Sequence, residues 1–325
     1  RGDFILHPAL KPLGPGERTE VVWELFWFES REVFEESLIR TGRIPVLGTR
    51  QCTYFPNETI SFDVFYGRFE ENADIAVTCN DWPVPFQYEW DGSVTCVHCE
   101  KKADQEGEHR VCVKVGDKML NAVFFESPNL RSLVKNRCKF IAEKQQYHGT
   151  VAALNGAYLV YDNEEETIYY SHRDDHNGGR ERLGMGALMA LWLQKEDDPY
   201  LRKSLERYVK YMYRESYDEE TGTVYNDINR NLDWHRKYNY PWTAILQIEL
   251  YRLTKEAHYL EHAYRTMRKY YQEGGDRFYA IGIPVMELAA LMEAEHMDAQ
   301  KADLETRFFK HADVILENGI SYPSH

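Results

Sequence analysis

The stretch YYSHRDDHNGGRERLGMGALMALWLQ, residues 169–194, contains the transition that decides the fold of this chain. Its first half crowds ionisable side chains around a Gly-Gly pair, and its second half is largely apolar. In the apolar half, Leu188, Leu191 and Trp192 lie three or four residues apart, which predicts a helix that begins near Gly179. The ionisable half is then the loop that leads into the amino end of this helix.

Five further apolar stripes with helical spacing follow, and the links between them are mostly short. They cover residues 201–212, 240–256, 260–270, 285–292 and 304–315. Six helices joined as hairpins predict a helical array. No internal repeat of about 20–50 residues is visible, which disfavours TPR or HEAT solenoids. We interpret the array as half of a closed, six-hairpin α/α-toroid, and we expect the toroid to be incomplete.

The segment upstream of residue 127 has a different pattern. Residues 44–126 contain short β-like runs about ten residues apart, typical of a small antiparallel β-sandwich. Residues 127–150 predict a linker helix with Ser127 as its N-cap, and residues 158–171 predict a β-hairpin with an acidic turn. Before the sandwich, residues 19–28 predict a strand and residues 30–42 a short helix that Gly42 ends.

The predicted fold class is therefore multidomain, with β and α parts. Residues 1–43 are expected to be the carboxyl-terminal remnant of an upstream β domain with a short helix, and residues 44–126 form the β-sandwich. Residues 127–150 are the linker helix, and residues 151–325 form the truncated α/α-toroid domain.

Composition narrows the classes of function. The 325-residue chain is 43% apolar, which permits a large core, and its formal net charge is −14. No long basic run exists, so we expect no nucleic-acid partner. No apolar stretch approaches the ~18 residues of a membrane span, so we expect no membrane partner. A local arginine cluster can still bind an acidic ligand, because electrostatic fields are screened beyond about 8 Å.

The cysteines raise the question of a metal site. CVHC at residues 96–99, with His109 and Cys112 nearby, looks like half of a zinc site, but no second CxxC follows. In a strand, residues three apart point to opposite faces, so Cys96 and Cys99 do not share a metal without a turn. We therefore expect buried or idle thiols, no metal and no other cofactor.

The ionisable loop carries the groups of a catalytic or anion-binding site. Helix amino ends favour anions, and Arg180 with Arg182 is predicted to clamp a carboxylate or sulfate. The candidate carboxylates for acid–base chemistry are Asp174, Asp175 and Glu181, and the candidate bases or ligands are His172 and His176. Tyr169 or Tyr170 becomes a proton donor or acceptor if an arginine lowers its pKa. The alternative is a helix cap with a surface ion-pair network.

A second cluster lies in YNDINRNLDWHRKYNYPW, residues 225–242, between the second and third helices. It contains Asp227, Asp233 and His235 among the aromatic side chains of Trp234, Tyr238 and Trp242. Polar groups beside aromatic faces are typical of a sugar site. Alternate loops of an antiparallel array lie at the same end, so we expect both clusters to line one cleft. The alternative is a long solvated loop.

Three segments resemble proteins of the six-hairpin glycosidase superfamily, which contains bacterial glycoside hydrolases and polysaccharide lyases with (α/α)6 toroids. HNGGRERLGMGALMALWLQ, residues 176–194, is similar to a segment of such proteins, including relatives that act on glucuronate-containing glycans. The start of an added β-sandwich in such proteins is similar to residues 55–67, FPNETISFDVFYG. The end of their preceding supersandwich domain is similar to residues 13–28, LGPGERTEVVWELFWF. The resemblance carries no catalytic pair over to this chain.

The resemblance implies a bacterial carbohydrate-active enzyme whose partner is an oligo- or polysaccharide, expected to be acidic. Our first hypothesis is a glycoside hydrolase on a uronate-bearing glycan. Hydrolysis needs two carboxylates, ~5–5.5 Å apart for retention or ~6.5–9.5 Å for inversion. The pair would combine Asp174 or Asp175 with Asp227, Asp233 or Glu181, while Arg180, Arg182 and the side chains around Trp234 hold the substrate.

Two alternatives stay open. In a polysaccharide lyase, His172, His176 or a tyrosine would remove the proton α to the uronate carboxylate, and Arg180 would neutralise the developing charge. The third hypothesis is a non-catalytic glycan-binding fragment. The chain starts at Arg1 and shows no signal-peptide pattern, so we expect a fragment, and its compartment, periplasmic, secreted or cytoplasmic, stays open.

Overall fold

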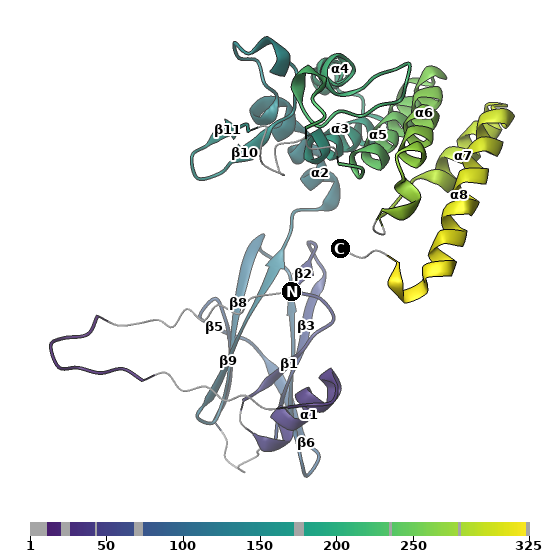
Figure 1. Ribbon diagram of the computed structural model, residues 1–325. Coiled ribbons are helices and arrows are strands. Elements are labelled where there is room, and N and C mark those ends of the chain that lie inside the picture. Colours follow the sequence, from purple (N-terminus) through teal and green to yellow (C-terminus); the bar gives the residue numbers. More distant parts are fainter. Residues whose placement is uncertain are drawn as a thin grey trace. The chain divides into compact units, whose positions relative to one another are not determined.

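The computed structural model in Figure 1 describes residues 12–20, 27–42, 44–67, 74–171, 179–233, 236–278 and 281–322. The side chains of residues 179–181 are outside this description. The chain divides into two units, residues 1–129 and residues 130–325, and each unit is described by itself.

The first unit opens with helix α1 (Arg31–Thr41). The Ser30 side chain accepts a hydrogen bond from the Val33 N–H at its start, and Gly42, with φ of 57°, caps its end. The predicted short helix that ends at Gly42 is therefore confirmed. The predicted strand over residues 19–28 lies largely outside the described residues.

Two β-sheets follow, and each has a defined strand order. The first sheet has the order β1-β3-β7-β6, formed by Val46–Gly48, Thr59–Tyr66, Thr95–Lys102 and Phe86–Trp90. The second has the order β2-β9-β8-β4-β5, formed by Thr53–Tyr54, Lys118–Glu126, Gly107–Val115, Ile75–Cys79 and Trp82–Pro83. These pairs are antiparallel as predicted, except that β2 runs parallel to β9.

The two sheets share one apolar core. In β3 every second residue is buried, from Ile60 to Tyr66, because successive side chains of a strand point to opposite faces. The Phe62 ring of the first sheet stacks on the Phe124 ring of the second, with 5.2 Å between centroids. The arrangement of this unit as a sandwich beside a toroid stays our prediction.

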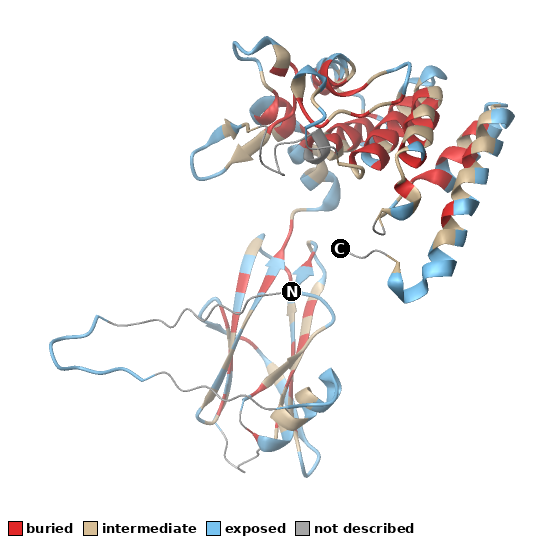
Figure 2. Cartoon of the chain, viewed as in Figure 1, coloured by how far each residue is buried: buried red, intermediate tan, exposed pale blue. Residues whose placement is uncertain are grey.

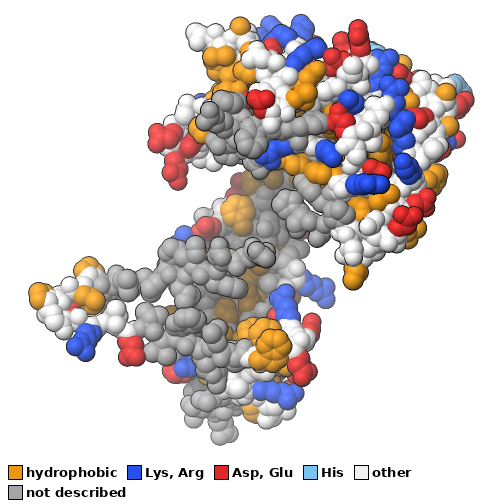
Figure 3. Space-filling model, viewed as in Figure 1, with side chains coloured by type: hydrophobic (Ala, Val, Ile, Leu, Met, Phe, Trp, Pro, Cys, Tyr) orange, Lys and Arg blue, Asp and Glu red, His pale blue; other side chains and the backbone are white. Residues whose placement is uncertain are grey.

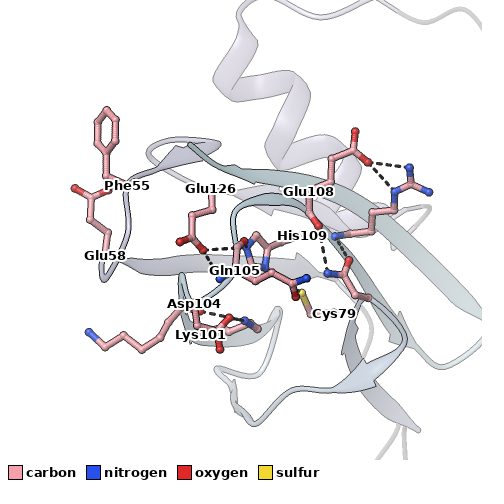
Figure 4. Close-up of polar contacts among 12 residues, drawn as sticks. Phe55, Glu58, Cys79, Lys101, Asp104, Gln105, Glu108, His109 and Glu126 are labelled. Carbon is pink, nitrogen blue, oxygen red and sulfur yellow. Dashed lines mark hydrogen bonds and ion pairs between the residues drawn. The ribbon is translucent and has the colours of Figure 1, made fainter. Parts of the chain in front are cut away.

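A buried polar cluster closes one end of this core (Figure 4). The Nε2 atom of His109 lies 2.9 Å from the Gln105 carbonyl oxygen and 3.3 Å from Glu126 Oε2, which also accepts the Gln105 N–H at 2.8 Å. The Cys79 thiol lies 3.9 Å from His109 Nδ1, and burial raises the pKa of Cys79. A protonated thiol is a poor nucleophile and a poor metal ligand, so the cluster is best explained as a tie that fixes the turn before β8.

The CVHC cysteines lie in β7. Cys99 is fully buried, and burial raises its pKa to about 12, whereas Cys96 is half-exposed. All six cysteines are free thiols. Across the ranges that the structure describes, no group of three or more His, Cys, Asp or Glu side chains is placed to hold a metal ion.

The second unit begins with helix α2 (Leu130–Phe140), which continues into a π-helical turn, Ile141–Gln145. The prediction that Ser127 is the N-cap is wrong. The helix starts three residues later, because the Ser127 N–H donates to the Tyr54 carbonyl oxygen and extends the ladder beside β9. The predicted hairpin is confirmed as β10 (Val160–Asp162) paired with β11 (Thr167–Tyr169).

In the described residues from 179 onward, six α-helices follow, as the periodicity predicted. They are α3 (Gly179–Leu193), α4 (Pro199–Tyr211), α5 (Asn239–Thr254), α6 (His258–Gln272), α7 (Val285–Ala294) and α8 (Asp298–Asn318). Helix α5 packs against both α3 and α6. Most of its residues are buried, as the red colour of this region in Figure 2 shows. Gly186 lets α3 pack closely, because a β-carbon there would lie 2.5 Å from the Tyr208 ring.

The surface of this unit carries mixed charge. On the face seen in Figure 3, lysine and arginine side chains alternate with aspartate and glutamate over the helices. Within the described ranges, every helix is too short or too polar to cross a lipid bilayer.

Candidate functional site

The site is built around a contact between the end of the hairpin and the loop after α4. Tyr170 follows β11, and its hydroxyl donates to both carboxylate oxygens of Asp227 at 3.0 Å. Asp227 is buried, with 4% of its surface exposed, and precedes the short 3-10 turn Ile228–Arg230. The hydrogen bond therefore ties together two segments that lie 57 residues apart.

Arg182 lies in the first turn of α3 and is 1% exposed. Its guanidinium carbon lies 5.7 Å from the centroid of the Tyr170 ring. Over the described part of the chain, none of the three guanidinium nitrogens has a hydrogen-bond partner. A buried cation without a partner costs several kcal/mol, on the order of the ~3–5 kcal/mol lost when a buried ion pair is broken. Arg182 is therefore a candidate partner for an anionic group, as its sequence context predicted.

The buried position of Tyr211 beside these groups shows how dry the site is. Burial raises the pKa of Tyr211 to about 12, the Arg182 charge opposes this shift, and the Asp227 charge adds to it. Its hydroxyl is also unpartnered in the described residues. In such a medium an electrostatic interaction is stronger than in water.

The protonation of Tyr170 follows from the same surroundings. Burial and the adjacent Asp227 carboxylate raise its pKa well above the usual tyrosine value, and Arg182 only partly offsets them. Tyr170 therefore keeps its proton at neutral pH. It is suited to donate a proton and is not a ready tyrosinate base, in contrast to the role that a lowered pKa would have given it.

Glu215 holds the turn beside Asp227 in shape. It is buried, and its Oε2 accepts the backbone N–H of Asn229 at 2.8 Å, while its Oε1 lies 2.6 Å from Arg214. Asn229 and Arg230 both adopt left-handed backbone conformations, with φ of 59° and 55°. Such conformations are uncommon for residues other than glycine and persist only where surrounding contacts hold them.

A cavity of about 550 Å³ opens over this turn, and we refer to it as the Asp227 cavity. Its wall is lined by Tyr170 and the seven residues from Asp227 to Asp233. Two predicted carboxylates thus face one space, Asp227 buried and Asp233 exposed. The volume lies in the range of small-ligand sites.

A second cavity, the α5–α7 groove, has a volume of about 430 Å³. It is lined by Tyr238, Pro241, Trp242, Ile245, Ile281, Gly282, Ile283, Pro284 and Glu287. Trp242 is 45% exposed, and a β-carbon built on Gly184 of α3 would lie 4.0 Å from its ring. The amino-terminal turns of α3 and α5 are therefore adjacent.

The predicted site residues divide into three groups. His172, Asp174, Asp175, His176, Trp234 and His235 lie outside the described residues, as do the side chains of Arg180 and Glu181. Asp227 and Arg182 meet at Tyr170. Asp233, Tyr238 and Trp242 line the two cavities. The roles of all these residues stay predictions.

Two members of the site were missed from the sequence. Glu215 lies in the π-helical turn that ends α4, and Tyr211 is the last residue of α4. Their side chains read as ordinary helix residues, and only the tertiary fold brings them to the turn at Asn229 and to Arg182.

Comparison with known proteins places this site in context. No protein-family model matches the sequence, and no curated protein is similar to it. A solved polysaccharide lyase superposes with a TM-score of 0.78 and 27% identity, over 90% of this chain and 43% of that chain. A family 76 glycoside hydrolase from a bovine Bacteroides thetaiotaomicron strain has a TM-score of 0.31 and 12% identity, over 82% of this chain and 78% of that chain. This second superposition is too weak to carry an argument.

This chain thus spans less than half of the solved lyase that it matches. The match nevertheless extends over both units of this chain, because it covers 90% of it. The resemblance of this chain to carbohydrate-active enzymes, which those motifs indicated, is confirmed by its similarity to a polysaccharide lyase.

Proposed function

We propose that this chain is part of a polysaccharide lyase that cleaves a uronate-bearing glycan by β-elimination, and that its helices are half of an α/α-toroid. The observation that carries the proposal is the buried guanidinium of Arg182, which has no hydrogen-bond partner among the described residues and lies 5.7 Å from the Tyr170 ring. Tyr170 and its partner Asp227 line a cavity. The similarity to a solved polysaccharide lyase supports the same reaction class.

The chemistry of β-elimination assigns a role to each of these groups. The reaction removes the proton α to the uronate carboxylate, forms a carbon–carbon double bond and expels the glycosidic oxygen, which takes up a proton. A cation beside the carboxylate stabilises the enolate-like charge, and a dry site strengthens that effect. Arg182, with Arg180 two residues earlier, would supply the cation.

Tyr170 is protonated at neutral pH, and we propose that it delivers this proton to the leaving glycosidic oxygen, which is basic enough as an alkoxide to take it from a weak acid. Asp227 orients the Tyr170 hydroxyl through the two 3.0 Å contacts. His172 or His176 would be the base that removes the substrate proton.

A glycoside hydrolase is the second candidate, and one observation favours it. Asp227 and Asp233 line the same cavity, so a pair of carboxylates faces one space. Hydrolysis uses such a pair, one as acid and one as base or nucleophile. The two reactions differ in their product, since only the lyase leaves an unsaturated sugar that absorbs in the ultraviolet.

The test is to incubate the chain, and the longer protein if the chain is part of one, with uronate-bearing polysaccharides. Ultraviolet absorbance and reducing ends are then measured together. We expect both signals to rise in parallel, and we expect Asp227→Asn and Arg182→Lys to abolish them while Asp233→Asn retains them. Reducing ends without absorbance, lost in Asp233→Asn, would select the hydrolase, and binding without turnover would select a glycan-binding protein.

A further inference from the structure

The α5–α7 groove has no role in the reaction at Arg182, and it contains an exposed tryptophan. We propose that this groove is a second subsite, in which one sugar unit of the same glycan stacks on Trp242 while its neighbour occupies the Asp227 cavity. The inference rests on the proposed function and extends it from one sugar unit to a bound oligosaccharide.

The exposure of Trp242 is the first observation. In the first three turns of α5, its neighbours Tyr240, Pro241, Thr243 and Ala244 are all buried, yet Trp242 is 45% exposed. Isoleucine and proline side chains from residues 281–284 form the other wall of the groove. A sugar ring presents an apolar C–H face, and an exposed aromatic ring with an apolar floor is the surface that such a face covers.

The polar rim of the groove is the second observation. Glu287 also lines it, and its Oε1 lies 2.6 Å from Nη1 of Arg252. The same Arg252 nitrogen lies 2.7 Å from Oε1 of Glu249, whose Oε2 accepts a hydrogen bond from Gln194. This network fixes a carboxylate at the edge of an apolar groove, where it can accept hydrogen bonds from sugar hydroxyls. A purely apolar ligand would not use it.

The closeness in sequence of the segments that line the two cavities is the third observation. The loop that lines the Asp227 cavity with residues 227–233 enters α5, and the first turns of α5 line the groove with Tyr238 and Trp242. On α3, Gly184 approaches the Trp242 ring, only two residues after Arg182. The two cavities are thus lined by neighbouring stretches of the chain, and we propose that one glycan spans both. The groove volume of about 430 Å³ is in the range of small-ligand sites.

The experiment compares Trp242→Ala and Trp242→Phe with a matched control, Trp82→Ala, in a tryptophan that is 77% exposed in the first unit. KM and kcat are measured for uronate oligosaccharides of increasing length. We expect Trp242→Ala to raise KM for a hexasaccharide about tenfold, the loss of roughly 1.4 kcal/mol of binding. The rise in KM for a disaccharide should be smaller than the rise for the hexasaccharide. Trp242→Phe should restore most of the wild-type affinity, and Trp82→Ala should have the KM of the wild type.

Binding without turnover separates this inference from the proposed function. In the Asp227→Asn background, calorimetric titration with the hexasaccharide should show the same weakening when Trp242 is replaced by Ala. An equal KM for Trp242→Ala and wild type at every length, with cleavage intact, would overturn the subsite and leave the lyase standing. Wild-type inactivity on all uronate glycans would overturn the lyase, and the titration would still decide whether Trp242 binds sugar.

Discussion

Replacing Arg182 by Met should raise the stability of the helical unit and abolish the proposed lyase activity. Met keeps the length of the side chain and removes a buried charge that has no hydrogen-bond partner in the described residues. Exchange of buried charged groups for apolar side chains of similar volume is neutral or stabilising by about 1–4 kcal/mol. For a unit of this size, each kcal/mol shifts Tm by about 2–4 °C, so about 1–4 kcal/mol corresponds to a rise of roughly 2–16 °C.

The assay is thermal unfolding followed by circular dichroism, with and without a uronate monosaccharide. The uronate should raise the Tm of the wild type, because it binds only the folded state, and should leave Arg182→Met unchanged. Arg214→Met is the matched control. It removes the partner of buried Glu215, so it should lower the Tm.

The refuting result is a fall in Tm for Arg182→Met comparable to that of Arg214→Met. Such a fall would show that Arg182 already has an anionic partner within the protein, and the argument that it awaits a substrate carboxylate would be lost.

Three further predictions follow from single contacts. Burial lowers the pKa of His262 to about 4, so this side chain is neutral in the folded protein. The free energy of unfolding should therefore fall as the pH drops from about 6.5, the pKa of the unfolded chain, towards 4, and His262→Gln should flatten this dependence in urea titrations. Gly186→Ala should lower the free energy of unfolding by about 1–3 kcal/mol, because the new β-carbon meets the Tyr208 ring, whereas Gly184→Ala should leave it unchanged. Chemical denaturation of both variants measures the difference. Glu215→Gln should lower kcat while Tm stays nearly unchanged, because it weakens the hydrogen bond that holds the turn beside the Asp227 cavity. An unchanged kcat would remove Glu215 from the site.

Local patterns predicted the elements of this fold well. Apolar spacing of three and four residues located the six helices from α3 to α8, and the short β-like runs over residues 44–126 marked the region of the two sheets. Gly42 ended α1 as expected, because a left-handed cap favours glycine. These features depend on residues close together in the sequence, where periodicity and capping act.

Features that depend on distant contacts were not predictable in the same way. The parallel pairing of β2 with β9 and the late start of α2 both depend on Ser127 and Tyr54 meeting across the sheet edge. The complete burial of Arg182 depends on packing around α3, and its sequence neighbours suggest an exposed clamp. The adjacency of Gly184 and Trp242 likewise appears only in three dimensions.

The turn at Asn229 and Arg230 has a consequence for the proposed binding of sugars. The first of its two left-handed residues is held by the Glu215 carboxylate, which accepts the Asn229 N–H, so the turn keeps its shape through contacts within the protein. Ligand association then loses little loop entropy, and rigid shape can discriminate between sugars that differ only in the direction of one hydroxyl. A change that frees this turn would therefore broaden the range of accepted glycans before it weakens the fold.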